Sequence, residues 1–75
     1  MNETPKIEKG TYRHTKSGKL YDVLGVALNT ETEEFEVIYR PLYDAEYELF
    51  ARQYPMFVET VEIDSVIVPR FEKLP

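Results

Sequence analysis

The stretch FEVIYRP, residues 35–41, shows the clearest alternation of side chains in the chain. In an extended conformation, Phe35, Val37 and Tyr39 all fall on one face, because successive side chains of a strand point to opposite sides. The other face carries two charged residues and one isoleucine. A β-strand with one buried face is therefore predicted here, and the neighbouring segments can be interpreted outward from it.

Two further strands are predicted before this stretch, over Gly10–Thr15 and Leu20–Asn29. Both segments are rich in β-branched and aromatic or aliphatic residues, and Lys16–Lys19 between them has the composition of a turn. Along the second segment the apolar preference changes face at Gly25. A glycine at such a point is typical of a bulge or bend, so this hairpin is expected to bend there.

The register of this hairpin depends on the length of its loop. If residues 17–18 alone form the loop, His14 faces Tyr21 across the pair. Arg13 then faces Asp22, which would be a favourable cross-strand charge pair. A bulged turn would shift both pairings.

The segments after residue 28 predict a second turn, a fourth strand and one helical turn. Residues 29–33 are polar and break the apolar pattern, so they predict the turn. Residues 47–53 can form a strand, although a short helix within residues 44–52 is an alternative that propensity does not exclude. Residues 55–57 begin with a proline and are expected to form one turn of helix or an irregular corner.

A second hairpin is predicted near the C-terminus. Residues 61–63 and 66–68 flank Asp64-Ser65, a two-residue loop that would pair Ile63 with Val66 and Val61 with Val68. The following proline ends the ladder, and Phe71 is expected to fold back into the core.

Together these segments predict an all-β or mainly β domain, a small antiparallel barrel of SH3-like type with five to six short strands and at most one short helical turn. The expected organisation is a flexible N-terminal leader over residues 1–9, one barrel domain over 10–71, and a frayed C-terminus over 72–75.

Composition limits the classes of function. The chain has 75 residues, no cysteine and a net charge of −5, so a thiol nucleophile is excluded and broad nucleic-acid binding is disfavoured. No apolar run is long enough to span a bilayer and no signal peptide is recognisable, which predicts a cytoplasmic protein with no membrane contact. The charge is uneven, however: residues 1–29 carry five Lys or Arg against three acids. The first part of the domain could thus present a basic face.

Aromatic and basic residues gather in the first hairpin and around the third strand, and they are the candidate ligand-binding residues. They are Tyr12, His14, Lys16, Tyr21, Tyr39, Arg40, Tyr43 and Arg52. Tyrosine rings at a rim can form a recognition surface, and an arginine can bind a carboxylate or phosphate in a bidentate manner. The alternative is that the rings build the core and each arginine pairs with Glu36, Glu48 or Asp44.

Catalytic and metal chemistry finds little support in the sequence. His14 is the only histidine and hence the only candidate for a catalytic base near neutral pH. Ser17 and Ser65 stand in predicted turns without a nucleophile motif or a local base. The acids at positions 31, 33, 34 and 36 are interpreted as a solvated turn, so neither a metal site nor a cofactor is expected.

A series of short motifs runs from Gly10 to Phe71. It comprises Gly10-x-Tyr12-x-His14-x-Lys16-x-Gly18-x-x-Tyr21-x-Val23, Glu31-Thr32, Val37-Ile38-Tyr39-Arg40 followed by Tyr43, Arg52 followed by Met56-Phe57, and Val68-Pro69-Arg70-Phe71. As a set, these motifs resemble a bacterial family of domains of unknown function, DUF1653. The resemblance implies a small cytoplasmic bacterial domain and supplies no activity. The chain departs from the family pattern after Arg52, where Gln53 stands in place of a proline, so a reshaped corner is expected there.

The function expected from these observations is a non-catalytic binding module that recognises a peptide or a small anionic ligand through an aromatic and basic face. Two alternatives stay open. One is a small enzyme that uses His14 with a carboxylate such as Glu31, and the other is a structural domain that forms a homodimer. The oligomeric state is accordingly left as monomer or homodimer.

Overall fold

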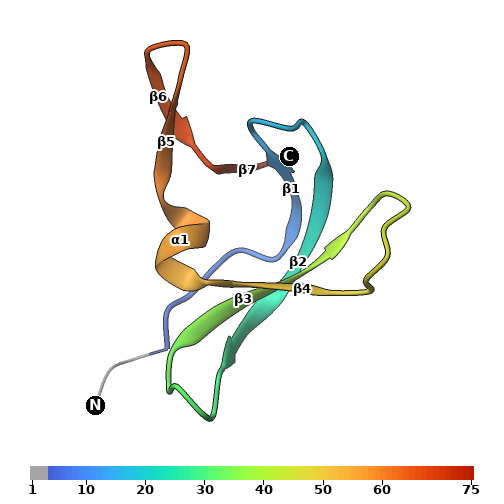
Figure 1. Ribbon diagram of the computed structural model, residues 1–75, viewed down its shortest axis with the longest axis vertical. Helices are drawn as coiled ribbons and strands as arrows, with labels where there is room; N and C mark the ends of the chain where they lie inside the picture. Colours follow the sequence, from blue (N-terminus) through green and yellow to red (C-terminus); the bar gives the residue numbers. More distant parts are fainter. Residues whose placement is uncertain (1–3) are drawn as a thin grey trace.

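The computed structural model describes residues 4–75, so the first three residues of the expected leader lie outside the described part (Figure 1). It contains seven strands and one short helix. In chain order these are β1 (Gly10–His14), β2 (Leu20–Leu28), β3 (Phe35–Pro41), β4 (Phe50–Gln53), α1 (Tyr54–Val58), β5 (Thr60–Ile63), β6 (Val66–Pro69) and β7 (Phe71–Lys73).

The strands form two antiparallel sheets. Five of them make one sheet in the order β4-β3-β2-β1-β7, and β5 pairs with β6 alone, as a hairpin that extends away from the sheet and is called here the β5–β6 arm (Figure 1). The mainly β class is confirmed. Closure into a barrel is not, because within residues 4–75 no pairing joins β4 to β7. The number of strands is seven rather than the expected five or six.

The central strands follow the predicted pattern. Val37 and Tyr39 of β3 are buried on the core face, as the alternation of residues 35–41 predicts. In β2 the register shifts between Val23 and Gly25, which leaves Leu24 as the extra residue of a β-bulge. The bend expected at Gly25 is therefore present, and it lets β2 follow both neighbouring strands.

The first hairpin pairs in a different register from the one predicted for a two-residue loop. Tyr12, not His14, lies opposite Tyr21, and Arg13 lies opposite Leu20. The loop is longer, because the His14 carbonyl accepts a hydrogen bond from Gly18 N–H (2.7 Å) and the pairing starts only beyond it. The displacement is by two residues, so each side chain keeps its predicted face although its partner changes.

The second hairpin and the corner before it agree with the sequence. Ile63 pairs with Val66 and Val61 with Val68, as predicted, and the loop residues between them both have positive φ (51° and 65°). This conformation suits the twist of a two-residue hairpin. Pro55 lies in the first turn of α1, so the single helical turn is confirmed, while residues 50–53 form strand rather than helix.

Both ends of the domain pack against it more closely than expected. Glu72 and Lys73, assigned to a frayed terminus, instead continue β7 and pair with β1, whose outer edge would otherwise leave its peptide groups unpaired. At the other end, the Tyr12 hydroxyl donates to the carbonyl of Glu8 (2.8 Å), and Ile7 packs against the core.

The core is built mainly of aromatic rings. Its buried members are Tyr12, Tyr21, Val23, Val37, Tyr39, Phe57 and Phe71. Phe57 of α1 and Phe71 of β7 stack with centroids 4.0 Å apart and planes 7° from parallel, so the short helix is joined to the sheet through this pair. Nowhere in residues 4–75 is a helix long and apolar enough to cross a membrane.

Candidate functional site

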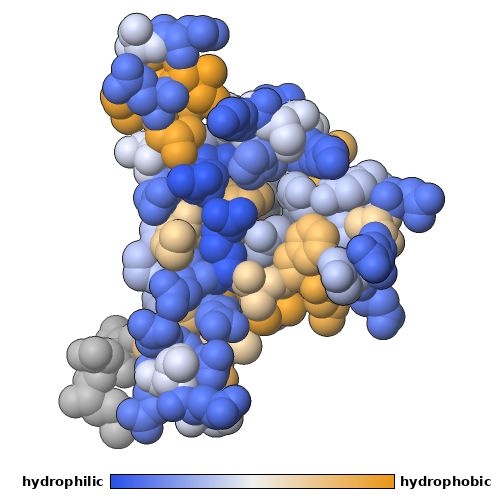
Figure 2. All heavy atoms as spheres, in the orientation of Figure 1, coloured by the Kyte–Doolittle hydropathy of each residue, from blue (hydrophilic) through white to orange (hydrophobic). Residues whose placement is uncertain are grey.

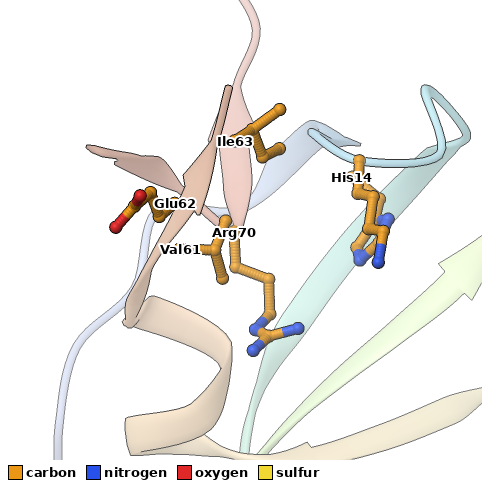
Figure 3. Close-up of a pocket in the computed structure, with 6 residues that line it drawn as sticks. His14, Val61, Glu62, Ile63 and Arg70 are labelled. Atoms are coloured by element: carbon orange, nitrogen blue, oxygen red, sulfur yellow. The ribbon is translucent and has the colours of Figure 1, made fainter. Parts of the chain in front are cut away.

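A cleft of about 310 Å³ lies between the β1–β2 turn and the β5–β6 arm, and it is called here the His14 cleft (Figure 3). Its lining residues are His14, Lys16, Val61, Glu62, Ile63 and Arg70. In Figure 3 the side chain of His14 stands across the gap from Val61, Ile63 and Arg70, whereas the carboxylate of Glu62 points away from it. The cleft thus combines an apolar wall with basic side chains.

Backbone hydrogen bonds join the two walls at the base of the cleft. Thr15 N–H donates to the carbonyl of Arg70 (2.9 Å), which links the β1–β2 turn to the segment between β6 and β7. Arg70 N–H donates in turn to the carbonyl of Glu59, immediately before β5 (3.0 Å). Because these bonds are made within the chain itself, the cleft is formed without a ligand.

The ring of His14 is held by the turn that follows it. Its Nδ1 lies 2.9 Å from Ser17 Oγ and accepts the Ser17 backbone N–H at 3.3 Å. Lys19 N–H donates to the same Ser17 Oγ (3.2 Å), which leaves the hydroxyl proton free to point at the ring. Nδ1 is consequently an acceptor, and the proton of the neutral ring resides on Nε2. A base beside Ser17 is not apparent from the sequence, and here it caps the turn.

Positive charge surrounds His14. Burial lowers the pKa of His14 below its ordinary value of 6.5, and the nearby positive charges of Arg52, Arg70 and Lys16 lower it further. The ring is therefore neutral at physiological pH and presents a hydrogen-bond donor. Three cations thus act on one ring, and one of them, Arg70, is also paired with Glu59.

Arg70 retains unused donors. Its Nη2 lies 2.7 Å from a carboxylate oxygen of Glu59 in an ion pair, and its side chain is 27% exposed. Its Nε is buried, and no hydrogen-bond partner for it exists among the described residues. Since a guanidinium has five N–H donors, one carboxylate at this distance does not satisfy it.

Arg52 lies beside the same aromatic support. Its guanidinium carbon is 5.4 Å from the centroid of Phe71, while the His14 ring meets Phe71 edge-on at 5.0 Å. Its Nε also donates to the Tyr39 hydroxyl (3.4 Å). The ion pairs formed within residues 4–75 involve Arg13, Arg40 and Arg70, so Arg52 forms none with a described carboxylate.

The tyrosines predicted for the site face the interior. Tyr12, Tyr21 and Tyr39 are all buried, and the Tyr21 hydroxyl lies 2.9 Å from that of Tyr43. Burial and this hydrogen bond raise the pKa of Tyr21, so the phenol stays protonated. Lys19 covers Tyr43, with its ammonium 4.7 Å from the ring centroid. None of these rings lines the His14 cleft, although Tyr21 and Tyr39 contact Phe71, against which the His14 ring packs.

Arg40 lies away from the cleft. Its Nη2 is 2.9 Å from an Asp22 carboxylate oxygen across the β2–β3 pair, so its partner is none of the three acids considered from the sequence. Of the eight predicted residues, the structure brings His14 and Lys16 together at the cleft, with Arg52 close to His14. A ligand role for the whole set stays a prediction.

The pairing of His14 with Glu31 does not occur. Glu31 lies in the turn after β2, whereas His14 lies before its beginning, and nine strand residues span roughly 25–30 Å. No group of three His, Cys, Asp or Glu side chains suited to a metal ion lies together in the described part of the chain.

Four lining residues, Val61, Glu62, Ile63 and Arg70, were not singled out from the sequence as site residues. The signal for Arg70 is its position between Pro69, which ends β6, and Phe71, which returns to the core, because this forces it to the junction of the two sheets. Figure 2 shows strongly hydrophilic side chains down the middle of the viewed face, between the β5–β6 arm and the large sheet. The conspicuous polar surface of this view thus lies in the same region as the cleft.

Comparison with known proteins places this geometry in context. The family described as "Protein of unknown function (DUF1653)" matches residues 10–73. The crystal structure of a protein of the same family from Bordetella bronchiseptica is similar with a TM-score of 0.84 and 36% sequence identity, and the match covers 91% of this chain and 87% of that one. No curated protein matches the chain.

Proposed function

The chain belongs to DUF1653, a family of proteins of unknown function, and we propose that its His14 cleft binds a small anionic ligand without catalysing a reaction on it. The observation that supports this most is that Lys16 and Arg70 line the cleft together with His14, while Arg52 and the His14 ring both contact Phe71. Like charges held close together repel one another, and a bound anion would relieve that repulsion.

The donors at the cleft suit an anion. Arg70 has guanidinium N–H groups beyond the one that meets Glu59, Lys16 is exposed, and the neutral His14 ring carries its proton on Nε2. Hydrogen bonds from charged donors to an anion are stronger than those between neutral groups. The single lining carboxylate, Glu62, points away from His14, so it does not compete for these donors (Figure 3).

The same contacts argue against catalysis. A general base needs a free lone pair, and His14 Nδ1 is occupied by Ser17 while its Nε2 carries the proton. The surrounding cations lower the pKa of the ring further and so weaken it as a base. A role as a donor that positions a ligand fits this arrangement better than proton transfer does.

The test is a titration of the intact protein with sodium acetate and, separately, with inorganic phosphate at constant ionic strength, followed by the NMR signals of His14 and Arg70. We expect shifts clustered on these two side chains and a higher pKa for His14 in the bound state, because a bound anion stabilises the imidazolium. Arg70→Gln should weaken binding about tenfold, which corresponds to roughly 1.4 kcal/mol. Arg40→Gln, which changes the same residue type outside the cleft, should leave it unaltered.

Two results would count against the proposal. One is the absence of shifts at His14 and Arg70 with either anion up to high millimolar concentration. The other is an equal loss of affinity in the two arginine variants, since that would indicate attraction by the overall charge instead of a defined site.

A further inference from the structure

We infer that the ligand of the His14 cleft is a carboxylate with a branched apolar group next to it, such as the C-terminus of a peptide ending in leucine, isoleucine or valine, or a free branched-chain acid. The inference rests on the proposed anion site and adds to it the chemistry of the opposite wall.

That wall is apolar because of the period of β5. Val61 and Ile63 are separated by one residue, so the pleat of the strand places both on the same face, and both are half-buried. Val68 of β6 lies directly opposite Val61 and is half-buried too, whereas Thr60 and Glu62 alternate with them and are exposed. Val61 and Ile63 thus present branched aliphatic groups to the cleft, while the carboxylate of Glu62 points away from it (Figure 3).

The backbone places the basic side chains of the cleft close to its aliphatic wall. Arg70 follows β6 directly and also pairs with Glu59, which directly precedes β5, so its guanidinium lies at the base of the arm that carries Val61. An acid group bound at Arg70 and His14 would therefore have its adjacent carbon atoms beside the aliphatic wall. A small polar anion would leave that wall in contact with water.

The size and polarity of the cleft favour a carboxylate over a phosphate dianion. At about 310 Å³ the cleft lies at the lower end of the range for ligand cavities, which suits a small acid or the last residue of a peptide. Placing two negative charges against Val61 and Ile63 would cost more desolvation than placing one. One carboxylate also matches the planar fork of a guanidinium, and Arg70 keeps N–H donors beyond its single Nη2 contact with Glu59.

The experiment measures the affinity of the intact protein for acetate, phosphate, 4-methylpentanoate, N-acetyl-leucine, and the peptide Gly-Gly-Leu with either a free or an amidated C-terminus. Each buried methylene strengthens binding about fourfold, so a tail that buries two of them should bind roughly 15-fold more tightly than acetate. We expect this gain for 4-methylpentanoate and N-acetyl-leucine, and we expect the amidated peptide not to bind.

Variants of the β5–β6 arm test whether its aliphatic residues cause the higher affinity for branched acids. Ile63→Ser should abolish most of the advantage of the branched acids, so that the ratio of their affinity to that of acetate falls toward one. Val61→Thr, which keeps the shape of the side chain, serves as a second variant in case the serine variant unfolds the arm. Ile67→Ser is the matched control, because Ile67 is on the same arm, is 64% exposed and does not line the cleft.

The outcomes separate the two proposals. Acetate binding at His14 with no gain from a branched tail, or phosphate binding more tightly than the branched acids, would overturn this inference and leave the anion site standing. Failure of every anion to bind at His14 and Arg70 would overturn both. A tripeptide that binds more tightly than N-acetyl-leucine would identify a chain terminus as the source, and equal affinities would identify a free acid; either result supports the shared chemistry.

Discussion

Replacing Phe57 by leucine should destabilise the protein substantially although it preserves most of the apolar volume. Phe57 is 1% exposed, stacks on Phe71 at 4.0 Å, and meets Tyr12 and Tyr39 edge-on at 5.7 and 5.3 Å. Each aromatic pair contributes about 0.5–1.5 kcal/mol beyond its buried area, and a swap of this kind in a packed core costs up to about 1.5 kcal/mol more. Since such contributions overlap, the expected loss is about 2–3 kcal/mol.

This loss is large relative to the total free energy of unfolding. A domain of 75 residues has a free energy of unfolding of about 4–11 kcal/mol. Urea unfolding followed by circular dichroism measures the change, and with a slope near 1 kcal/mol/M for so small a protein the midpoint should fall by about 2–3 M. The matched control is Met56→Leu, in the same helix and 46% exposed, which should change the free energy of unfolding by less than about 0.5 kcal/mol.

A midpoint for Phe57→Leu within about 0.5 M of that for Met56→Leu, at unchanged slope, would refute the reasoning. It would mean that the stack between α1 and β7 contributes no more than any exposed apolar contact. The position of α1, and of the cleft residues in the strands that follow it, would then need another explanation.

Two further predictions concern pH and backbone conformation. Because the pKa of His14 is lowered by folding, the unfolded chain binds more protons below pH 6.5, so the free energy of unfolding should fall as the pH drops from 6.5 toward the folded-state pKa. His14→Gln should remove that part of the slope in urea titrations between pH 5 and 7, and an identical slope in both proteins would contradict the assignment. Gly18 has φ 77° with open space around its Cα, so Gly18→Ala should cost about 1 kcal/mol from backbone strain alone. Ser65→Gly, at φ 65°, should instead stabilise the arm by roughly 0.5–1 kcal/mol, and thermal melting that moved both variants in the same direction would rule out this reading of the two turns.

Much of the fold could be predicted because it depends on local chemistry. The alternation of residues 35–41, the glycine at the β2 bulge and the Asp64-Ser65 loop each specify their own conformation. The register of the first hairpin could not be predicted, since loops of two and four residues around Gly18 have equally good turn chemistry. Whether the sheet closes into a barrel, and where β7 pairs, could not be predicted either, because both depend on contacts between segments far apart in the chain.

The residues of the candidate site likewise include some that the sequence predicts and some that it does not. His14 and Lys16 were identified because polar residues in a hairpin are visible in the sequence. The buried tyrosines were wrongly placed on the ligand-binding face, because the sequence does not distinguish a tyrosine whose ring lines a rim from one whose ring fills a core. Arg70 was missed as a site residue because its role follows from where β6 ends and the chain crosses to the large sheet.

The separation of the β5–β6 arm from the aromatic core has a consequence for substitutions at the cleft. Aliphatic residues of other sizes at positions 61 and 63 would leave the buried aromatic cluster unchanged, since neither position belongs to it. The stacked rings under the cleft allow no such freedom. Substitutions at these two positions would therefore alter the wall of the cleft while leaving the aromatic cluster that supports the sheet intact.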